Sequence, residues 1–272
     1  MQAGLRRFPV ELGNGADDER FFQLDDASPR YAEAKAAILD AGDAVGRRHR
    51  FVAADEASPG DLEALEAVRA WMLERLSVEW PGHLPSSADF DALARGLQED
   101  FAILRRPDAD APERAIGVSV CFPSGWRPEA IYGTSFAAIH APVPDFVDDA
   151  RAARSMVDSM IERGPYLRFV WTVSADDDLD HHPEHGHRAK WNENARGWLR
   201  VERQLTIPFA THGASLFLIR THLYAFETLD AEQRETLSTA LERMPDVIAE
   251  YKGLSASRST ILETLARSGP RR

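Results

Sequence analysis

The stretch that decides the fold is Trp198–His222, WLRVERQLTIPFATHGASLFLIRTH, because it joins two strand-like runs through residues typical of turns. The first run ends near Pro208, and the second begins after His212-Gly213. Proline and glycine at these positions favour a reversal of the chain between two strands. The stretch therefore predicts a β-hairpin.

The first run carries charge where a half-buried strand is normally apolar or only mildly polar. Arg200, Glu202 and Gln204 alternate with apolar residues, so three strong hydrogen-bonding groups share one face of the strand. The second run is almost wholly apolar until it reaches Arg220. A hairpin that buries two arginines and a glutamate must satisfy them against one another or against a charged ligand. The pattern fits a structural salt bridge as well as a ligand site.

Helical and strand patterns alternate along the rest of the chain and predict an α+β fold. Ser58-Pro59 is a helix-start signal followed by apolar residues at helical spacing, and Pro81 ends that helix. Alternating residues at 116–122 and 166–174 predict two further strands. Helices are expected at 31–44, 59–80, 90–104, 145–163 with Asp145 as its cap, 230–250 and 257–268. We expect one domain, 1–272, with an irregular N-terminal arm, 1–30, and a C-terminal helix and tail, 255–272.

The charge balance limits the partners. Lysine and arginine number 32 against 44 aspartates and glutamates, a net charge of −12, which argues against nucleic acid and anionic membranes. An acidic surface suits small cationic substrates or a basic protein partner. No apolar run reaches the length of a membrane span, and the N-terminal residues lack the apolar core of a signal peptide, so we expect a cytoplasmic protein. The single cysteine, Cys121, excludes an internal disulfide and a cysteine-rich metal or iron–sulfur site.

Common catalytic and cofactor motifs are missing from the sequence. Neither of the glycine-rich phosphate-binding patterns, GxGxxG after a strand or GxxxxGK[ST], occurs, and neither does the GxSxG serine elbow. The polar loop 176–190 holds four histidines, but mobile loops seldom hold a metal ion firmly, so no metal is expected there. The carboxylates of Glu99 and Asp100 are expected to be solvated, unless their helix packs against a cationic element.

His140 and Cys121 are the residues that suit a haem iron. His140 ends an apolar run and precedes Pro142 and Pro144, which predict a rigid extended segment. A histidine there is either a core residue bonded to a backbone carbonyl or a neutral imidazole that ligates haem. Cys121 is the rival ligand, although a lone cysteine on a strand is usually inert packing.

Six short motifs recur in an order that resembles a known family. They are Gln98-Glu99-Asp100-Phe101, Phe122-Pro123-Ser124-Gly125-Trp126-Arg127-Pro128, Ile139-His140-Ala141-Pro142-Val143-Pro144, Arg200-Val201-Glu202-Arg203-Gln204, Phe217-Leu218-Ile219-Arg220-Thr221 and Tyr251-Lys252. Together they span roughly residues 90–254, and their combined order is specific although each motif alone is weak. The chain resembles the haem-dependent oxidative N-demethylase family.

The resemblance implies a PAS-like antiparallel sheet, flanked by helices, that encloses haem b and activates dioxygen against a secondary amine. In such enzymes dimethylamine loses a methyl group as formaldehyde. Flavin and ferredoxin-type reductase subunits supply the electrons, which agrees with the absence of nucleotide and iron–sulfur motifs in this chain. On this basis we expect a haem-dependent monooxygenase for a small, dimethylamine-like amine.

The resemblance also suggests roles for individual residues. His140 would be the proximal ligand, and Arg200 or Arg220 would neutralise the haem propionates. Glu202 would accept the ammonium group of the substrate and could assist proton delivery if burial raised its pKa. Trp171 and Phe217 would form walls of the pocket.

Two segments depart from the family pattern. Val170 stands in Arg168-Phe-Val-Trp171, where the family tends to have asparagine, and Thr206–His212 replaces a basic Leu-Pro-Arg type of continuation. Both segments are expected near the pocket, so they bear on the substrate more than on the fold.

Two other classes of function fit the same features. One is a PAS-like haem sensor of gas or redox state, although the sequence has no kinase, cyclase or DNA-binding module. The other is a haem-free interaction domain in which the arginines only pair with carboxylates. Turnover of an amine with a surrogate reductant distinguishes an enzyme from a sensor. An absorption spectrum of the purified, haem-supplemented protein distinguishes both from a haem-free domain.

Overall fold

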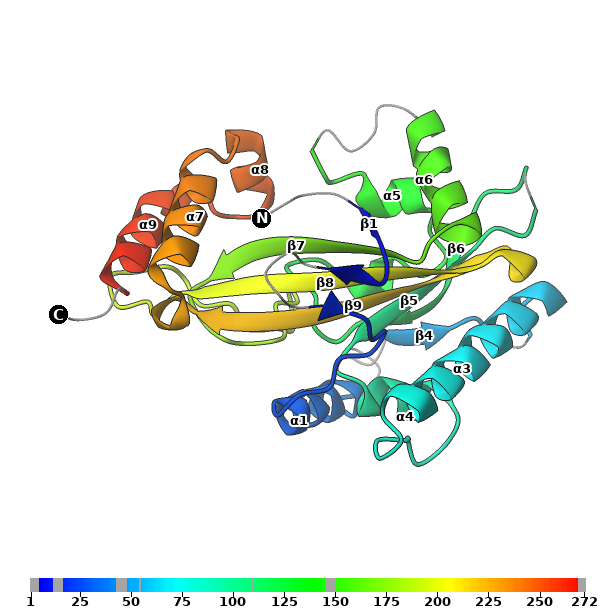
Figure 1. Ribbon diagram of the computed structural model, residues 1–272. Coiled ribbons are helices and arrows are strands. Elements are labelled where there is room, and N and C mark those ends of the chain that lie inside the picture. The colour runs from blue at the N-terminus through cyan, green and yellow to red at the C-terminus, as the bar shows by residue number, and fades with distance from the viewer. Residues whose placement is uncertain are drawn as a thin grey trace.

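A computed structural model describes residues 5–11, 17–42, 48–53, 55–108, 110–144 and 150–268. Its centre is a seven-stranded sheet in the order β1-β7-β8-β9-β5-β6-β4, and every pair of neighbours is antiparallel (Figure 1). The strands are β1 (Arg6–Arg7), β4 (His49–Phe51), β5 (Asp100–Arg105), β6 (Arg114–Ser119), β7 (Tyr166–Ser174), β8 (Trp198–Phe209) and β9 (Ala214–Ala225). Two short strands, β2 (Val10–Glu11) and β3 (Asp17–Asp18), pair separately. The α+β prediction is confirmed.

The predicted hairpin is the centre of this sheet. Strands β8 and β9 have 12 residues each and pair along their whole length, from Trp198↔Ala225 to Phe209↔Ala214. The turn is a short 3-10 helix, Ala210–His212, followed by Gly213 at φ +59°. Glycine adopts this left-handed conformation without the strain that a Cβ atom would cause.

Helices cover the sheet in three groups. They are α1 (Ser28–Leu39), α3 (Pro59–Glu79), α4 (Phe90–Gly96), α5 (Phe136–His140), α6 (Ala150–Glu162), α7 (Ala231–Glu242), α8 (Asp246–Tyr251) and α9 (Arg258–Arg267). In Figure 1, α1, α3 and α4 lie below the sheet, α5 and α6 lie above it, and α7, α8 and α9 gather at one end.

Helix α3 shows how local sequence produces the main core. Ser58 accepts a hydrogen bond from the backbone of Asp61, whose side chain bonds back to Ser58, so the first turn is capped reciprocally. The buried stripe of Val68, Met72 and Leu76 then follows at helical spacing. These side chains pack against Ile103, Leu205, Leu216 and other residues of the sheet.

The two faces of the sheet can be named by the helices that cover them. Successive residues of a strand point to opposite faces, and paired residues share a face. Leu216, in the core with α3, marks the α3 face, whereas its neighbour Ser215 is paired with Leu104, which packs against Val157 and Ile161 of α6. We call the second surface the α6 face.

Three local predictions are wrong. The helix expected at 90–104 ends at Gly96, and β5 begins at Asp100, because residues 98–100 are buried where the chain enters the sheet rather than solvated. The helix expected at 230–250 is divided at Pro245, which opens α8. Residues 141–144 form turns instead of an extended segment. The expected helix cap, Asp145, lies outside the described residues.

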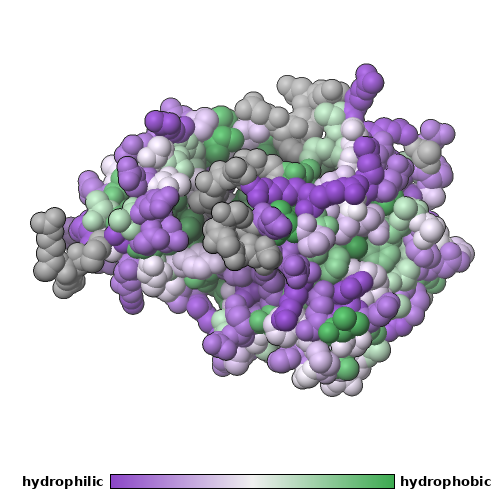
Figure 2. Space-filling model, in the orientation of Figure 1, coloured by the Kyte–Doolittle hydropathy of each residue, from purple (hydrophilic) through white to green (hydrophobic). Residues whose placement is uncertain are grey.

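The described residues of the N-terminal arm form the short strands β1, β2 and β3 before α1 begins at Ser28. On the side of the molecule seen in Figure 2, hydrophilic residues predominate and hydrophobic ones occur in small areas, in keeping with the high charge content. None of the described helices combines the length and the apolar character that crossing a membrane requires.

Candidate functional site

Strand register gathers the polar residues of the hairpin on the α6 face. Gln204 is paired with Arg168 of β7, and Glu202 is paired with Val170 of β7 and with Thr221 of β9. Because Arg200 lies two residues from Glu202, it shares this face. The predicted common face of Arg200, Glu202 and Gln204 is therefore confirmed.

Hydrogen bonds link five side chains in a row, and we call this row the Glu202 network. Its members are, in order, Arg168, Gln204, Glu202, Ser124 and Arg200. Arg168 Nε donates to Gln204 Oε1 at 2.6 Å, and Gln204 Nε2 donates to Glu202 Oε2 at 2.8 Å. From the other side, Ser124 Oγ donates to Glu202 Oε1 at 2.6 Å and accepts from Arg200 Nε at 2.8 Å. Glu202 is thus held between two cationic side chains.

Arg200 is fully committed to the protein. Its side chain is buried, and besides Ser124 it donates to the carbonyl oxygens of Phe122, Asp178 and Leu179 at 2.8 to 3.2 Å. Burial lowers the pKa of Arg200, and the nearby charge of Glu202 opposes that shift. Arg200 therefore fixes loops around the network, which differs from the expectation that it holds a haem propionate.

Arg220 lies on the α3 face, because it is paired with Arg203. Arg203 is next to Glu202 in β8, so its side chain points to the opposite face of the sheet. The guanidinium of Arg220 donates to Asp25 at 3.0 Å, and its central carbon lies 4.1 Å from the ring centre of Tyr31. The structure thus separates Arg220 from the Glu202 network, although Arg220 was expected, as an alternative to Arg200, to neutralise a haem propionate in the same pocket.

The two aromatic residues expected in the pocket also divide between the faces. Phe217 is paired with Thr206 and Ala102 and so lies on the α6 face. Trp171 is paired with Val201 on the other face, where its ring packs against the core formed by α7 and α9. Only Phe217 shares the face of Glu202.

Arg168 has open hydrogen-bond donors beside the Glu202 network. Its Nε atom binds Gln204, but within the described residues its two terminal NH2 groups make no hydrogen bond. Burial lowers the pKa of Arg168, while the charges of Glu202 and Tyr251 act against that shift. A half-buried guanidinium with two free donor groups suits an anionic ligand.

His140 ends α5, whose first turn is capped by Ser135. The ring nitrogen Nδ1 lies 2.8 Å from the carbonyl oxygen of Phe136, one turn earlier in the helix. A carbonyl only accepts, so the proton is on Nδ1 and Nε2 is the basic atom of the ring. Burial lowers the pKa of His140, and the positive charge of Arg168 lowers it further, so the imidazole is neutral at pH 7. A neutral imidazole oriented by a carbonyl is suited to bind a metal through Nε2.

Cys121 has the opposite character. Its side chain is fully buried in a cluster with Tyr31, Phe122 and Leu179. Burial, aided by the charge of Asp100, raises the pKa of the thiol to about 12, so the thiolate that ligates iron is strongly disfavoured at pH 7.

Tyr251 and Lys252, at the C-terminal end of α8, lie near enough to Glu202 to be affected by its charge. In Figure 1, α8 and α5 lie on the same side of the sheet. Lys252 Nζ donates to the carbonyl oxygen of Trp171 at 2.7 Å. Burial lowers the pKa of Lys252, and the charge of Glu202 opposes that shift. Burial raises the pKa of Tyr251, and the charge of Glu202 raises it further.

The histidine-rich loop is anchored rather than mobile. His181 and His182 are buried, and they hydrogen-bond to Asp176 at 2.9 Å and to Glu129 at 3.1 Å. Asp176, Asp178 and His187 each bring one ligand-type atom to within 4.8 Å of the others. Both carboxylates already accept hydrogen bonds within the loop, so this arrangement is explained by the loop itself.

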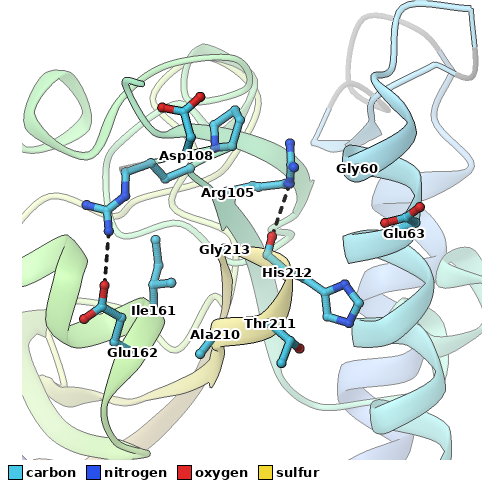
Figure 3. Close-up of a pocket in the computed structure, with 12 residues that line it drawn as sticks. Gly60, Glu63, Arg105, Asp108, Ile161, Glu162, Ala210, Thr211, His212 and Gly213 are labelled. Atoms are coloured by element: carbon cyan, nitrogen blue, oxygen red, sulfur yellow. Dashed lines mark hydrogen bonds and ion pairs between the residues drawn. The ribbon is translucent and has the colours of Figure 1, made fainter. Parts of the chain in front are cut away.

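Two cavities lie away from the Glu202 network. One of about 330 Å³ is at the tip of the hairpin, between α3, α6 and the end of β5 (Figure 3). There Arg105 donates to the carbonyl of His212 at 3.2 Å, and Arg106 pairs with Glu162 at 3.5 Å. The other, of about 560 Å³, is lined by Leu199, Tyr224 and the start of α7. Neither cavity is lined by His140 or Glu202.

The two departures from the family pattern fall in different places. Val170 is the direct neighbour of Glu202 on the α6 face. Residues 206–212 instead run to the turn of the hairpin, where Thr211 and His212 line the 330 Å³ cavity. Val170 is therefore the departure that bears on the Glu202 network.

Sequence reasoning gave no role to Arg168 and Ser124. Arg168 gave a partial signal, because it lies on the predicted strand 166–174, but the register that aligns it with Gln204 is not determined by the sequence alone. Ser124 carried no such signal, since it follows β6 in a turn and reaches Glu202 across 78 residues of sequence.

The fold and the site define a class: an antiparallel α+β protein in which a carboxylate between two arginines and a neutral histidine line one face of the sheet. A family model described as haem-dependent oxidative N-demethylase, alpha subunit-like, matches residues 71–262, more than half of the chain. The chain belongs to this family, and its resemblance on the six motifs is confirmed. The family description names a haem-dependent oxidative enzyme and one subunit of a larger assembly.

Proposed function

We propose that this chain is the haem-binding subunit of a monooxygenase that removes a methyl group from a small secondary amine resembling dimethylamine. The observation that carries the proposal is the Glu202 network, in which a carboxylate is presented on the same face of the sheet as Arg168, whose charge acts on a neutral His140. Family membership supports the haem and the oxidative chemistry.

The residues on the α6 face fit haem b. His140 would bind the iron through Nε2, because its Nδ1–H is used by the Phe136 carbonyl. Arg168 would neutralise a propionate with its two terminal NH2 groups. In this proposal the sheet is PAS-like and the haem pocket lies between α5 and the end of α8. Haem, when bound, would supply the activation of dioxygen and the oxidation of the methyl group.

Glu202 would bind and orient the substrate. A secondary amine is protonated at pH 7, and its ammonium group would donate to the carboxylate in a charge-assisted hydrogen bond. Val170, paired with Glu202 on the adjacent strand, would contact an apolar substituent of the amine. Phe217 would form part of the wall on the β9 side.

The overall reaction requires an external reductant. The amine and dioxygen, with two electrons and two protons, would give the demethylated amine, formaldehyde and water. Because no nucleotide or iron–sulfur motif occurs in the sequence, the electrons would come from flavin and ferredoxin-type subunits.

The first test is the absorption spectrum of the haem-supplemented protein in the oxidised, reduced and reduced carbon monoxide-bound states. We expect a Soret band that His140→Ala abolishes or shifts, whereas Cys121→Ala leaves it unchanged. A colourless protein after supplementation would overturn the proposal, and a strongly red-shifted carbon monoxide band lost in Cys121→Ala would move the ligand to the cysteine.

A second test separates substrate binding from haem binding. We expect Glu202→Gln to lose dimethylamine binding, measured by calorimetric titration, while its Soret band persists. Glu227→Gln, at an exposed carboxylate remote from the network, is the matched control and should bind the amine normally. Unchanged amine affinity in Glu202→Gln would contradict the role of this carboxylate.

A further inference from the structure

Every hydrogen bond of the Glu202 network runs from donor to acceptor toward Glu202. From this arrangement we infer that Ser124 and Gln204 are positioning residues, which set the orientation of the Glu202 carboxylate for a protonated secondary amine. This inference rests on the proposed function, because it assumes that Glu202 binds the amine. It assigns the work of orientation to two side chains that would not touch the substrate.

On the Ser124 side, the direction follows from Arg200. A guanidinium only donates hydrogen bonds, so Ser124 Oγ must accept from Arg200 Nε, and its one proton is left for Glu202. Arg200 itself is held by three backbone carbonyls. The serine hydroxyl therefore has one orientation, in which it donates to Glu202 Oε1.

Backbone contacts also fix the loop that carries Ser124. Phe122 N donates to Asp100 Oδ2 at 2.7 Å, and Gly125 N donates to the carbonyl of His181 at 3.1 Å. These bonds lie on either side of Ser124 and hold its backbone against β5 and the histidine-rich loop. The hydroxyl is consequently presented to Glu202 from a rigid support.

On the Gln204 side, Arg168 has the same effect. Arg168 Nε also only donates, so the atom it meets in Gln204 must be the amide oxygen, and the amide NH2 then faces Glu202. An amide side chain normally has two orientations related by a flip. Here the arginine selects one of them.

Both arms therefore deliver a donor to Glu202, one to each carboxylate oxygen. A carboxylate has about four acceptor sites, of which the network uses two. The remaining site on each oxygen matches the two N–H groups of a secondary ammonium ion.

The experiment measures dimethylamine binding by calorimetry on haem-loaded variants of the full chain, with the Soret band and carbon monoxide affinity as readouts of the haem. We expect Ser124→Ala to weaken amine binding roughly 10- to 100-fold, the loss typical of a hydrogen bond to a charged group. Ser124→Thr, which keeps the hydroxyl, should restore binding to within about threefold of the wild type. Carbon monoxide affinity should stay unchanged in both variants.

Ser215→Ala is the matched control. Ser215 is buried on the same α6 face, and its hydroxyl has no hydrogen-bond partner within the described residues, so its loss tests the removal of a buried hydroxyl alone. Gln204→Met tests the second arm independently, should Ser124→Ala fail to fold, and is also expected to weaken amine binding roughly 10-fold or more.

Two results overturn different statements. If Glu202→Gln loses the amine while Ser124→Ala and Gln204→Met bind it as well as Ser215→Ala does, the positioning role is refuted and the proposed function stands. If Glu202→Gln binds the amine normally, the proposed role of Glu202 fails, and the positioning inference fails with it. Weakened binding in Ser124→Ala with rescue in Ser124→Thr supports the inference.

Discussion

At the scale of single residues, His222 couples folding to pH. Burial lowers its pKa from 6.5 to about 4, and the positive charge of Arg220 adds to this shift. In the folded protein its neutral ring meets Gln23 Oε1 at 3.1 Å. Because the folded-state pKa lies below the unfolded-state value, the unfolded chain binds more protons between pH 6.5 and about 4, so stability falls as the pH falls through that window.

We expect His222→Gln to remove this pH dependence. Between pH 7 and pH 5, the free energy of unfolding of the wild type should fall by about 2 kcal/mol more than that of His222→Gln. Urea denaturation at both pH values measures the difference, and His83→Gln, at an exposed position, is the control. Equal pH dependence in the wild type and His222→Gln would contradict the assignment.

The sequence predicted the site only as far as strand periodicity reaches. Alternation placed Arg200, Glu202 and Gln204 together, because the side chains of one strand follow a period of two. Arg220 and Trp171 were misplaced, since whether they share that face depends on the register between strands, which a single sequence does not determine.

At the scale of elements, the turn of the central hairpin depends on Gly213. It has a φ of +59°, and a Cβ atom added there would lie 2.3 Å from the carbonyl oxygen of Arg106, whose own N–H donates to the Gly213 carbonyl at 2.8 Å. Gly133 also has a positive φ, +75°, but a Cβ atom there would meet nothing within 4 Å. Alanine substitutions at these two glycines therefore distinguish the cost of backbone strain alone from the cost of strain together with a steric clash.

We expect Gly133→Ala to lower the free energy of unfolding by about 1 kcal/mol, the cost of the left-handed conformation alone. Gly213→Ala should lower it by at least about 3 kcal/mol, because the clash with the β5 end is added to that strain. Chemical denaturation of both variants provides the comparison. Equal losses in the two variants would mean that the backbone near Arg106 shifts to accommodate the added Cβ atom at little cost in free energy.

Element prediction succeeded where local signals agree with tertiary packing. The strand Tyr166–Ser174 and the helix begun by Ser58-Pro59 have the predicted limits or nearly so. The segment 90–104 failed, because its second half looks helical and polar but enters the sheet, where Asp100 meets the buried Lys35 at 3.2 Å. Lys35 is remote in sequence, so nothing local announces this partner.

At the scale of the whole molecule, whose net charge is −12, two buried arginines of the hairpin form ion pairs with the N-terminal arm. Arg203 of β8 makes a two-pronged contact with Asp18, Nε to Oδ2 at 2.6 Å and Nη2 to Oδ1 at 2.8 Å. Arg220 of β9 pairs with Asp25 at 3.0 Å. The arm, predicted only to be irregular, therefore supplies counter-charges to arginines of the central strands.

Removing one of these counter-charges should destabilise the fold far more than removing a surface partner. Arg203 and Asp18 have side chains only 1% and 4% exposed, so Asp18→Asn leaves a buried guanidinium without its counter-ion and puts an amide in place of one acceptor oxygen. We expect a loss of about 3–5 kcal/mol in the free energy of unfolding. Asp177→Asn breaks the Arg30–Asp177 pair, whose side chains are 47% and 49% exposed, and should cost under about 1 kcal/mol. Urea denaturation at pH 7 compares them directly. Equal small losses would mean that the arm detaches from the hairpin at little cost, so that water reaches Arg203 in place of Asp18.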